Sequence, residues 1–485
     1  MVFSSLEFVS LFLVSFFLLY YIVPNRMAKN TIIFLFSLFF YAWGEPIYVF
    51  LMLGSIIINY VLALKMQKYK EVEEKKNNSY RYAEIKHARK MVKVMLLSSI
   101  IVDLGLLVVF KYTDFLVDNM NNWFGFKIPN PEISLPIGIS FFTFQILSYV
   151  VDVYNGKCKV QTNLINLGAY ISCFPQLIAG PIVRYSDIED DLTNRKETLE
   201  LTSEGMRDFI VGFSKKALIA NTCGEIIKVL GEYSNVQYKM IGAIIIALCY
   251  TLQIYFDFSG YSDMAIGLGK MMGFRYCKNF DYPYIASSIT DFWRRWHISL
   301  SSFFRDYVYI PLGGNRVKVW RHILNLLIVW FLTGLWHGAS WNFVLWGLYY
   351  GVLLIIEKYT PEKIKKHVPK FIAHLLTIIL VVFGWIIFRI ETMDEFCEFM
   401  KTLFGYYGAG HLEFLKHIGI VAPHYIIAFI LAIIGSTPLV KKIYDKLKDN
   451  KVWFITFDVL LIFILILSIC FVAVGTYNPF IYFKF

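Results

Sequence analysis

The chain has 485 residues, of which 57% are apolar and 18% aromatic, and its formal net charge is +11. A water-soluble protein of this length could not bury so large an apolar fraction, so lipid must be part of its solvent. The apolar residues form blocks of helical length rather than alternating strands, which favours a helical bundle over an outer-membrane barrel. The positive charge does not indicate a nucleic-acid partner, because Lys and Arg cluster in short loops between apolar blocks, as in cytoplasmic loops.

The apolar segments predict an all-α, polytopic transmembrane bundle of about 11–12 spans with additional short or re-entrant helices. Several of the predicted segments are too short to cross about 30 Å of hydrocarbon, and we expect those around 134–151, 163–183 and 322–334 to be re-entrant or buried inside the bundle. The chain shows no internal repeat or linker, so we expect a single domain over residues 1–485. The predicted helical segments are 3–23, 31–43, 46–63, 93–117, 134–151, 163–183, 208–230, 238–257, 322–334, 341–356, 371–390, 424–437 and 453–475.

The distribution of charge predicts the topology. The lysine-rich and arginine-rich stretches 64–93, 358–370 and 441–451 are typical of cytoplasmic loops, whereas the more acidic stretch 391–423 suits the outside. Counting spans from these loops places both termini outside the cell. The segment 3–23 lacks a basic leader and a cleavage site and is expected to be a retained span. The seven cysteines are scattered, with neither a zinc-like spacing nor a disulfide framework, and no metal site is expected.

His337 is the first candidate for a functional residue. It lies in the apolar run FLTGLWHGASWNFVLWG, and an ionisable side chain at membrane depth is costly and therefore a functional hypothesis by default. Its small neighbours Gly334, Gly338, Ala339 and Ser340 would let another backbone or a substrate approach closely. The alternatives are a neutral core histidine bonded to a carbonyl group, or a patch in which helices pack through these small residues. The residues alone leave these possibilities open.

His297 is the second candidate, within the aromatic and basic segment 258–321, which Pro and Gly break into short helices. A helix here would pair Asp291 with Arg295 and place Trp293 and His297 on one face. With Arg294 and Arg305 nearby, such a face could hold a flat, phosphate-bearing cofactor at the cytoplasmic surface. The alternative is an interfacial aromatic belt with cationic anchors.

Two further groups are notable. Asp257, Ser259, Tyr261 and Asp263 end an apolar span, but carboxylates six residues apart do not share a helical face, so we expect a structural polar network or a helix cap rather than acid–base catalysis. The C-terminal tail 477–485 is strongly aromatic and includes Tyr482, which the topology places outside.

The ordered motifs GYSDMAIGLGKMMGF, NFDYPYIASSITDFWRRWHISLSSFFRDYVYIPLGG and FLTGLWHGASWNFVLWG resemble the membrane-bound O-acyltransferase family. The similarity is greatest to the bacterial branch that O-acetylates alginate, other exopolysaccharides and peptidoglycan. It is densest over about residues 135–350 and extends to the aromatic tail. The resemblance implies a helical bundle enclosing a central funnel in the cell membrane.

The resemblance also implies roles for particular residues. His337 corresponds to the family's essential histidine and His297 to its second histidine. The basic mouth formed by Trp293, Arg294, Arg295 and Arg305 would receive cytoplasmic acetyl-CoA, which is a substrate, so no bound cofactor is implied. In the related D-alanylation system a separate peptide carries an FxYxxF pattern, which Phe480, Tyr482 and Phe485 reproduce here.

Tyr482 is thus a candidate acyl relay by resemblance, and a separate extracytoplasmic transferase of the SGNH type is the implied partner. The resemblance predicts transfer of acetyl from acetyl-CoA to an extracytoplasmic polysaccharide. The alternative within the family is D-alanyl transfer to teichoic acid, although the chain's own tail motif counts against it. From another class, a secondary transporter would use His337 as a ligand or proton site, although no repeat symmetry supports it. The sequence does not identify the final glycan.

Overall fold

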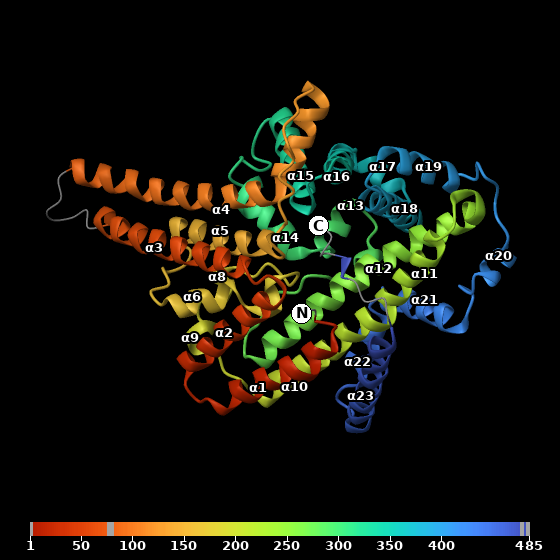
Figure 1. Cartoon of the computed structure of the whole chain (residues 1–485), viewed down its shortest axis with the longest axis horizontal. Helices are drawn as coiled ribbons and strands as arrows, with labels where there is room; N and C mark the ends of the chain where they lie inside the picture. Colours follow the sequence, from red (N-terminus) through yellow and green to blue (C-terminus); the bar gives the residue numbers. More distant parts are fainter. Residues whose placement is uncertain (1–2, 75–81, 476–479, 482–485) are drawn as a thin grey trace. The chain divides into compact units, whose positions relative to one another are not determined.

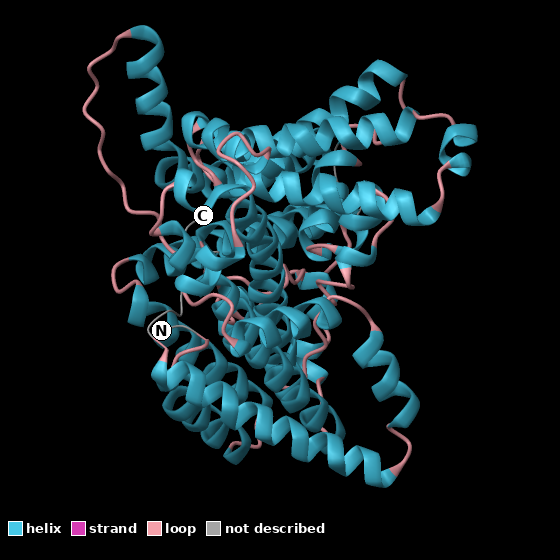
Figure 2. Ribbon diagram, turned by 90° about the vertical axis from the view of Figure 1, so that its right-hand side faces the viewer, coloured by secondary structure: helices cyan, strands magenta, loops and turns pink. Residues whose placement is uncertain are grey.

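A computed structural model describes residues 3–74, 82–475, 480 and 481. In these residues all the regular structure is helical, as the ribbon in Figure 2 shows. The all-α prediction is therefore confirmed. By internal contacts the chain forms two compact units: residues 1–205 with 268–277, and residues 206–267 with 278–485. The single domain expected over 1–485 stays a prediction.

The first unit contains the N-terminal helices, which run from red to yellow in Figure 1. A long antiparallel pair, α3 and α4, dominates it. Ser99, Asp103, Leu107 and Lys111 form one buried stripe on α4, spaced four residues apart as one helical face requires. The helices are η1 (Phe8–Phe12), α1 (Leu13–Ile22), α2 (Arg26–Gly44), α3 (Tyr48–Glu74), α4 (Tyr82–Phe124), α5 (Ile139–Asn155), α6 (Leu164–Ile171), α7 (Phe174–Leu177), α8 (Tyr185–Ile188) and α9 (Asp191–Asn194).

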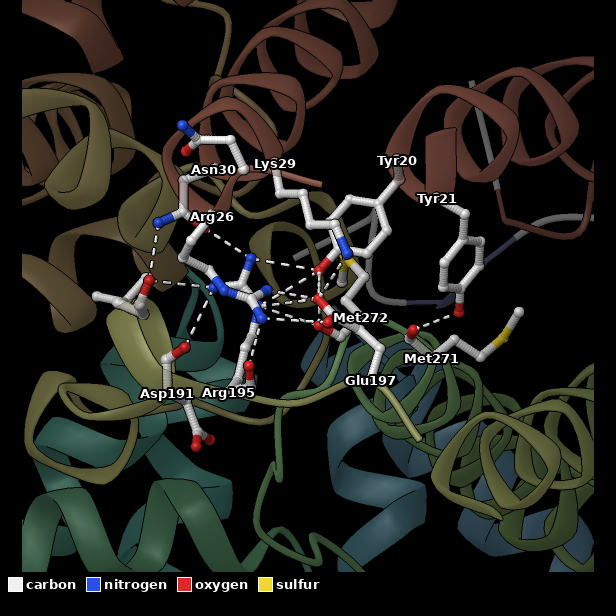
Figure 3. A network of polar contacts seen from close by, with 12 residues as sticks. Tyr20, Tyr21, Arg26, Lys29, Asn30, Asp191, Arg195, Glu197, Met271 and Met272 are labelled. Atoms are coloured by element: carbon white, nitrogen blue, oxygen red, sulfur yellow. Dashed lines mark hydrogen bonds and ion pairs between the residues drawn. The ribbon is translucent and has the colours of Figure 1, made fainter. Parts of the chain in front are cut away.

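A dense polar network connects helices α1 and α2 to the segment that follows α9 (Figure 3). Glu197 accepts hydrogen bonds from Arg26 at 2.5 Å and from the Tyr20 hydroxyl at 2.6 Å, and Lys29 lies 3.3 Å away. Arg195 donates to the side chain of Asn30 at 2.6 Å. Burial of Glu197 would raise its pKa, but the hydrogen bonds from Arg26 and Tyr20 outweigh that effect and lower the pKa to about 2. Glu197 is therefore ionised and offsets part of the positive charge around it.

The second unit contains the remaining helices, and α10 and α12 each run from one unit into the other. Within it, α10 and α12 cross at Gly212 and Gly260. A Cβ on Gly212 would lie 2.5 Å from the Gly260 carbonyl oxygen, and a Cβ on Gly260 2.7 Å from that of Gly212. The helices are α10 (Leu199–Ser214), η2 (Lys215–Ala220), α11 (Asn221–Gly231), α12 (Asn235–Met271), η3 (Pro283–Ile285), α13 (Ile289–Arg295), α14 (Ile298–Phe304), η4 (Arg305–Tyr309), α15 (Val319–His337), α16 (Trp341–Tyr359), α17 (Glu362–His367), α18 (Lys370–Arg389), α19 (Met393–Leu403), α20 (Leu412–His417), α21 (Pro423–Gly435), α22 (Leu439–Leu447) and α23 (Lys451–Val474).

Each apolar segment predicted from the sequence is wholly or largely helical. Within the described residues, seven helices are long and apolar enough to cross a membrane, or eight if the bent pair α21 and α22 is one span. The other predicted segments form shorter or less apolar helices, among them α5 and the broken pair α6 and α7. The segment 322–334 belongs to α15, whose 19 residues are long enough to span. The chain is a polytopic helical membrane protein.

Candidate active site

Both histidines singled out from the sequence lie at helix ends in the second unit, and both are buried. His337 is the last residue of α15 and is 3% exposed. His297 is the residue directly before α14. Its side chain is fully buried, and its backbone angles are φ 43° and ψ 55°. A non-glycine residue in this left-handed region is uncommon and is strained unless its surroundings hold it there. The fold thus fixes the His297 ring at a sharp turn between two short helices.

Asn279 determines which nitrogen of His297 carries the hydrogen. The Asn279 Oδ1 atom accepts from the Ser299 backbone N–H at 3.1 Å and from the Ser299 hydroxyl at 2.9 Å, and His297 Nδ1 lies 3.1 Å from the same atom. A backbone N–H can only donate, so the shared atom is the amide oxygen and Nδ1 must be the ring's donor. The Nε2 atom then holds a lone pair. It is buried and has no hydrogen-bond partner among the residues that the structure describes.

The charge state of His297 follows from its burial. His297 lies between α13 and α14, outside the helices long enough to span a membrane. Burial lowers the pKa of His297 to about 3, because the charged imidazolium is poorly solvated there. The ring is therefore neutral at physiological pH, with an unprotonated nitrogen available to accept a hydrogen bond.

Trp336 links the two histidines. Its ring centroid lies 5.9 Å from that of His297 and 5.0 Å from that of His337. The His337 ring is also packed edge-on against Trp346 and Phe388, at centroid distances of 4.9 Å and 5.3 Å. The structure thus brings together, around one indole, two histidines that are forty residues apart in the sequence.

The small residues near His337 serve close helix packing. A Cβ on Gly334 would collide with the Phe343 carbonyl oxygen, and one on Gly347 with the Trp330 carbonyl oxygen. A Cβ on Gly338 would meet the Phe343 ring. These glycines let α15 and α16 approach backbone to backbone, as small residues do in membrane helix pairs. This close approach of the two helices holds His337 against α16.

Several buried polar atoms beside the histidines lack a protein partner. Among the described residues, Trp293 Nε1, Trp346 Nε1, Tyr350 OH and Asn279 Nδ2 make no hydrogen bond. The rings of Trp293, Trp346 and Tyr350 lie within 5.6 Å of one another by centroid distance. Buried donors without partners are rare in folded proteins, and a group of them indicates a region that binds a polar molecule. Indole N–H groups can only donate, so they suit a carbonyl oxygen.

The expected cofactor-binding face is only partly present. Arg295 pairs with Asp291 at 2.9 Å, as the four-residue spacing predicted. However, α13 ends at Arg295, so the expectation that Trp293 and His297 share one helical face is wrong. The left-handed backbone of His297 turns the chain between them. Trp293 is buried against Trp330, Trp346 and Tyr350, on the aromatic cluster that also reaches His337. Of the two remaining arginines, Arg294 is exposed, and Arg305 is paired with its neighbour Asp306 at 2.7 Å.

The aspartates of α12 each have a lysine partner from η2. Asp257 lies 2.7 Å from Lys216, with both side chains almost fully buried, and Asp263 lies 2.6 Å from Lys215. Two consecutive lysines thus pair with carboxylates six residues apart, next to the crossing of Gly212 and Gly260. Ser259 lies between these two aspartates on α12 and is buried. Its hydroxyl makes no hydrogen bond to a described residue.

The C-terminal segment returns to this same region. The Ile481 backbone N–H donates to Asp257 Oδ2 at 2.8 Å. The Phe480 ring lies 4.9 Å from the Tyr261 ring, and Phe480 and Ile481 are 3% and 8% exposed. Tyr482, the candidate relay, and Phe485 lie outside the described residues. The two tail residues that are described are buried rather than interfacial.

Sequence reasoning missed four contributors to this site: Asn279, Trp336, Trp346 and Lys216. Trp336 and Trp346 lie in the same motif as His337, but nothing in an apolar aromatic run shows which ring faces the histidine. Asn279 opens the second motif, 18 residues before His297, and only the folded chain brings it to the ring. Across residues 3–74, 82–475, 480 and 481, no group of three or more His, Cys, Asp or Glu residues could hold a metal ion.

A helical membrane fold that buries two histidines, one of them held neutral, is compatible with an enzyme that uses a histidine in group transfer away from bulk water. The chain belongs to the membrane-bound O-acyltransferase family, whose model matches residues 48–393. It is therefore an O-acyltransferase, and we do not retain the transporter alternative.

Three relatives of the chain carry different functional names. The chain is 37% identical to a probable alginate O-acetylase from Pseudomonas putida, over the whole length of both proteins. It is 34% identical to a peptidoglycan O-acetyltransferase from Helicobacter pylori, over 86% of this chain and 84% of the relative. It is 30% identical to a teichoic acid D-alanyltransferase from Bacillus subtilis, over 52% of this chain and 68% of the relative.

Proposed function

We propose that the protein is a bacterial cell-membrane O-acetyltransferase that takes acetyl from cytoplasmic acetyl-CoA and passes it outward for O-acetylation of an extracytoplasmic polysaccharide of the alginate or peptidoglycan type. The observation that carries the proposal is the buried histidine pair around Trp336, with His297 held as a neutral ring whose Nε2 lone pair is available. The full-length similarity to an alginate O-acetylase supports acetyl as the transferred group.

In the proposed reaction, His337 is the general base. Its neutral imidazole takes the proton of an attacking hydroxyl while the hydroxyl oxygen adds to the thioester carbonyl carbon. The C–S bond then breaks, and the proton returns to the departing sulfur, so that the products are an O-acetyl ester and free coenzyme A. His297 accepts a hydrogen bond through Nε2. Its tautomer makes it unsuited to donate to the carbonyl oxygen, so the donors for that oxygen are the buried indole N–H groups of Trp293 and Trp346.

The proposed acceptor of the acetyl group is the Tyr482 hydroxyl in the tail, from which an extracytoplasmic SGNH-type partner moves acetyl to the glycan. Phe480 and Ile481 are buried against α12, which supports the proposal that the C-terminal segment packs on the helices of the enzyme. The proposal includes both termini on the outer side of the cytoplasmic membrane, in agreement with the basic loops expected inside. Arg294, Arg295 and Arg305 supply positive charge for the phosphates of acetyl-CoA.

The test of the base is His337→Ala, with the O-acetyl content of the glycan measured in cells that express equal amounts of inserted protein. We expect acetylation to be lost in His337→Ala. His322 is a matched control, because it is a buried histidine on the same helix whose two ring nitrogens are bonded to the Tyr309 and Tyr359 hydroxyls. His322→Ala should retain acetylation. Wild-type acetylation in His337→Ala would contradict the proposal.

The test of the relay is Tyr482→Phe, which removes one hydroxyl. We expect this variant to lose acetylation while it still binds acetyl-CoA, and undiminished acetylation would exclude Tyr482 as the acceptor. The D-alanyl alternative is favoured only by the partial similarity to a teichoic acid D-alanyltransferase. Membranes supplied with radiolabelled acetyl-CoA or with a D-alanyl carrier-protein thioester distinguish the two donors.

A further inference from the structure

The buried carboxylate of Asp257 holds two unlike partners at once. One oxygen lies 2.7 Å from the Lys216 ammonium, and the other accepts the Ile481 backbone N–H at 2.8 Å. The side chains of Asp257 and Lys216 are 2% and 4% exposed. A buried carboxylate needs both charge compensation and filled hydrogen-bonding positions, and here the cation supplies the first and the tail amide helps to supply the second.

The tail is held at two points with a fixed register. Asp257 and Tyr261 are one turn apart on α12 and therefore lie on the same helical face. Asp257 binds the backbone of Ile481, and Tyr261 packs against the ring of the preceding residue, Phe480. A shift of the tail by one residue could still offer a backbone N–H to Asp257, but it would remove the Phe480 ring from Tyr261, so the ring contact fixes the register. Tyr482 directly follows Ile481 in the sequence.

We propose that Asp257, held in place by Lys216, is a positioning residue that docks the C-terminal segment Phe480–Ile481 on α12. Transfer requires this docking, because the tyrosine proposed as the acyl acceptor follows directly in the sequence; this inference rests on the function proposed above. Asp257 takes no part in bond making. It acts through the backbone of the tail, and recognition through a main-chain amide does not depend on which side chain residue 481 carries.

The neighbouring pair provides an internal comparison. Asp263 and Lys215 form the same type of contact, at 2.6 Å, from the same two helices. Both Asp263 and Lys215 are partly exposed, with side chains 31% and 22% accessible. Within the described residues, Asp263 is paired with Lys215, whereas Asp257 also accepts a hydrogen bond from Ile481. A variant of either aspartate removes one ion pair, but only Asp257 should alter the tail.

The decisive variant is Ile481→Pro in the full-length protein in native membranes. Proline has no backbone N–H, so it removes the donor to Asp257 and leaves the Asp257–Lys216 pair untouched. Ile481→Val is the control, because it keeps the N–H. Carboxypeptidase releases the residues after position 481, and their release rate follows the population of undocked tail. We expect about tenfold faster release in Ile481→Pro than in Ile481→Val, from loss of one charge-assisted bond, together with a loss of glycan acetylation.

Asp257→Ala and Asp263→Ala extend the test to α12. We expect faster tail release and lost acetylation in Asp257→Ala, and wild-type behaviour in Asp263→Ala. Equal release from Ile481→Pro and Ile481→Val would overturn the docking. Faster release with undiminished acetylation in Ile481→Pro would overturn the role in transfer. The release assay does not depend on enzymatic activity. Failure of the proposed function would instead be seen as acetylation that survives in His337→Ala.

Discussion

Asn279 offers a sharp test of how the site is built. Replacing Asn279 with Leu keeps the volume similar and removes the amide oxygen that His297 Nδ1 and both donors of Ser299 share. A buried donor left without a partner costs about 1–3 kcal/mol. The His297 ring can escape that cost by moving its hydrogen to Nε2 or by rotating, and either change removes the lone pair from the site.

The expected effect on catalysis follows from that cost. If His297 acts through Nε2, a penalty of about 1–3 kcal/mol reduces the productive population, and hence the acetylation rate, by about 5- to 150-fold. The assay is acetyl transfer from radiolabelled acetyl-CoA in membranes that contain matched amounts of enzyme. Two further variants serve as controls. Ser299→Ala removes a donor but leaves the acceptor for His297, and Asn279→Asp keeps an oxygen at the same place.

We expect Ser299→Ala to remain near the wild-type rate. Asn279→Asp should recover activity at high pH and lose it as the pH falls, because a carboxylate beside the ring raises the pKa of His297 from its low value and favours the inactive cation. A rate within twofold of wild type in Asn279→Leu, at equal protein levels, would refute the tautomer argument. An equal loss in Ser299→Ala and Asn279→Leu would show that the network matters only for packing.

Three predictions concern stability. Because the pKa of His297 is about 3 in the folded chain against an ordinary value of 6.5, the unfolded chain binds the extra proton between these pH values. The free energy of unfolding should therefore fall by up to about 1.4 kcal/mol per pH unit as the pH drops from 6.5 towards 3. Thermal melts of His297→Gln should lack this loss. The same pH dependence of melting temperature in His297→Gln and wild type would contradict the prediction. Glu197→Gln should lower the melting temperature through a cost of about 3–5 kcal/mol, since it leaves buried cations uncompensated, whereas the exposed Glu362→Gln should not. Gly334→Ala should destabilise by about 1–3 kcal/mol and reduce acetylation, because its methyl group meets the backbone of α16, while Gly54→Ala, with nothing within 4 Å, should be neutral.

Much of the fold could be predicted because lipid imposes a simple pattern. Apolar blocks of helical length appear as helices, and the pairing of Asp291 with Arg295 follows from the four-residue spacing alone. The prediction that Trp293 and His297 share a face failed at one residue. No propensity indicates that His297 adopts a left-handed backbone, since tertiary contacts through Asn279 and Ser299 hold it there.

The candidate site shows the same division. The buried histidines could be identified because an ionisable residue in an apolar run is costly whatever it contacts. Their partners could not, because Asn279 and Trp336 are ordinary residues whose role depends on long-range packing. The pairing of Asp257 with Lys216 and with the amide of Ile481 joins segments far apart in the sequence. A backbone amide, in particular, carries no sequence signal.

The contact between Ile481 and Asp257 has a consequence for biosynthesis. Ile481 lies 224 residues after Asp257 in the chain, so all of the intervening chain must be synthesised before the contact can form. Lys216 and Asp257 are translated earlier and can meet while the later helices are still being inserted. Docking of Phe480 and Ile481 on α12 therefore comes late in assembly, after the helices that carry the two histidines have been made.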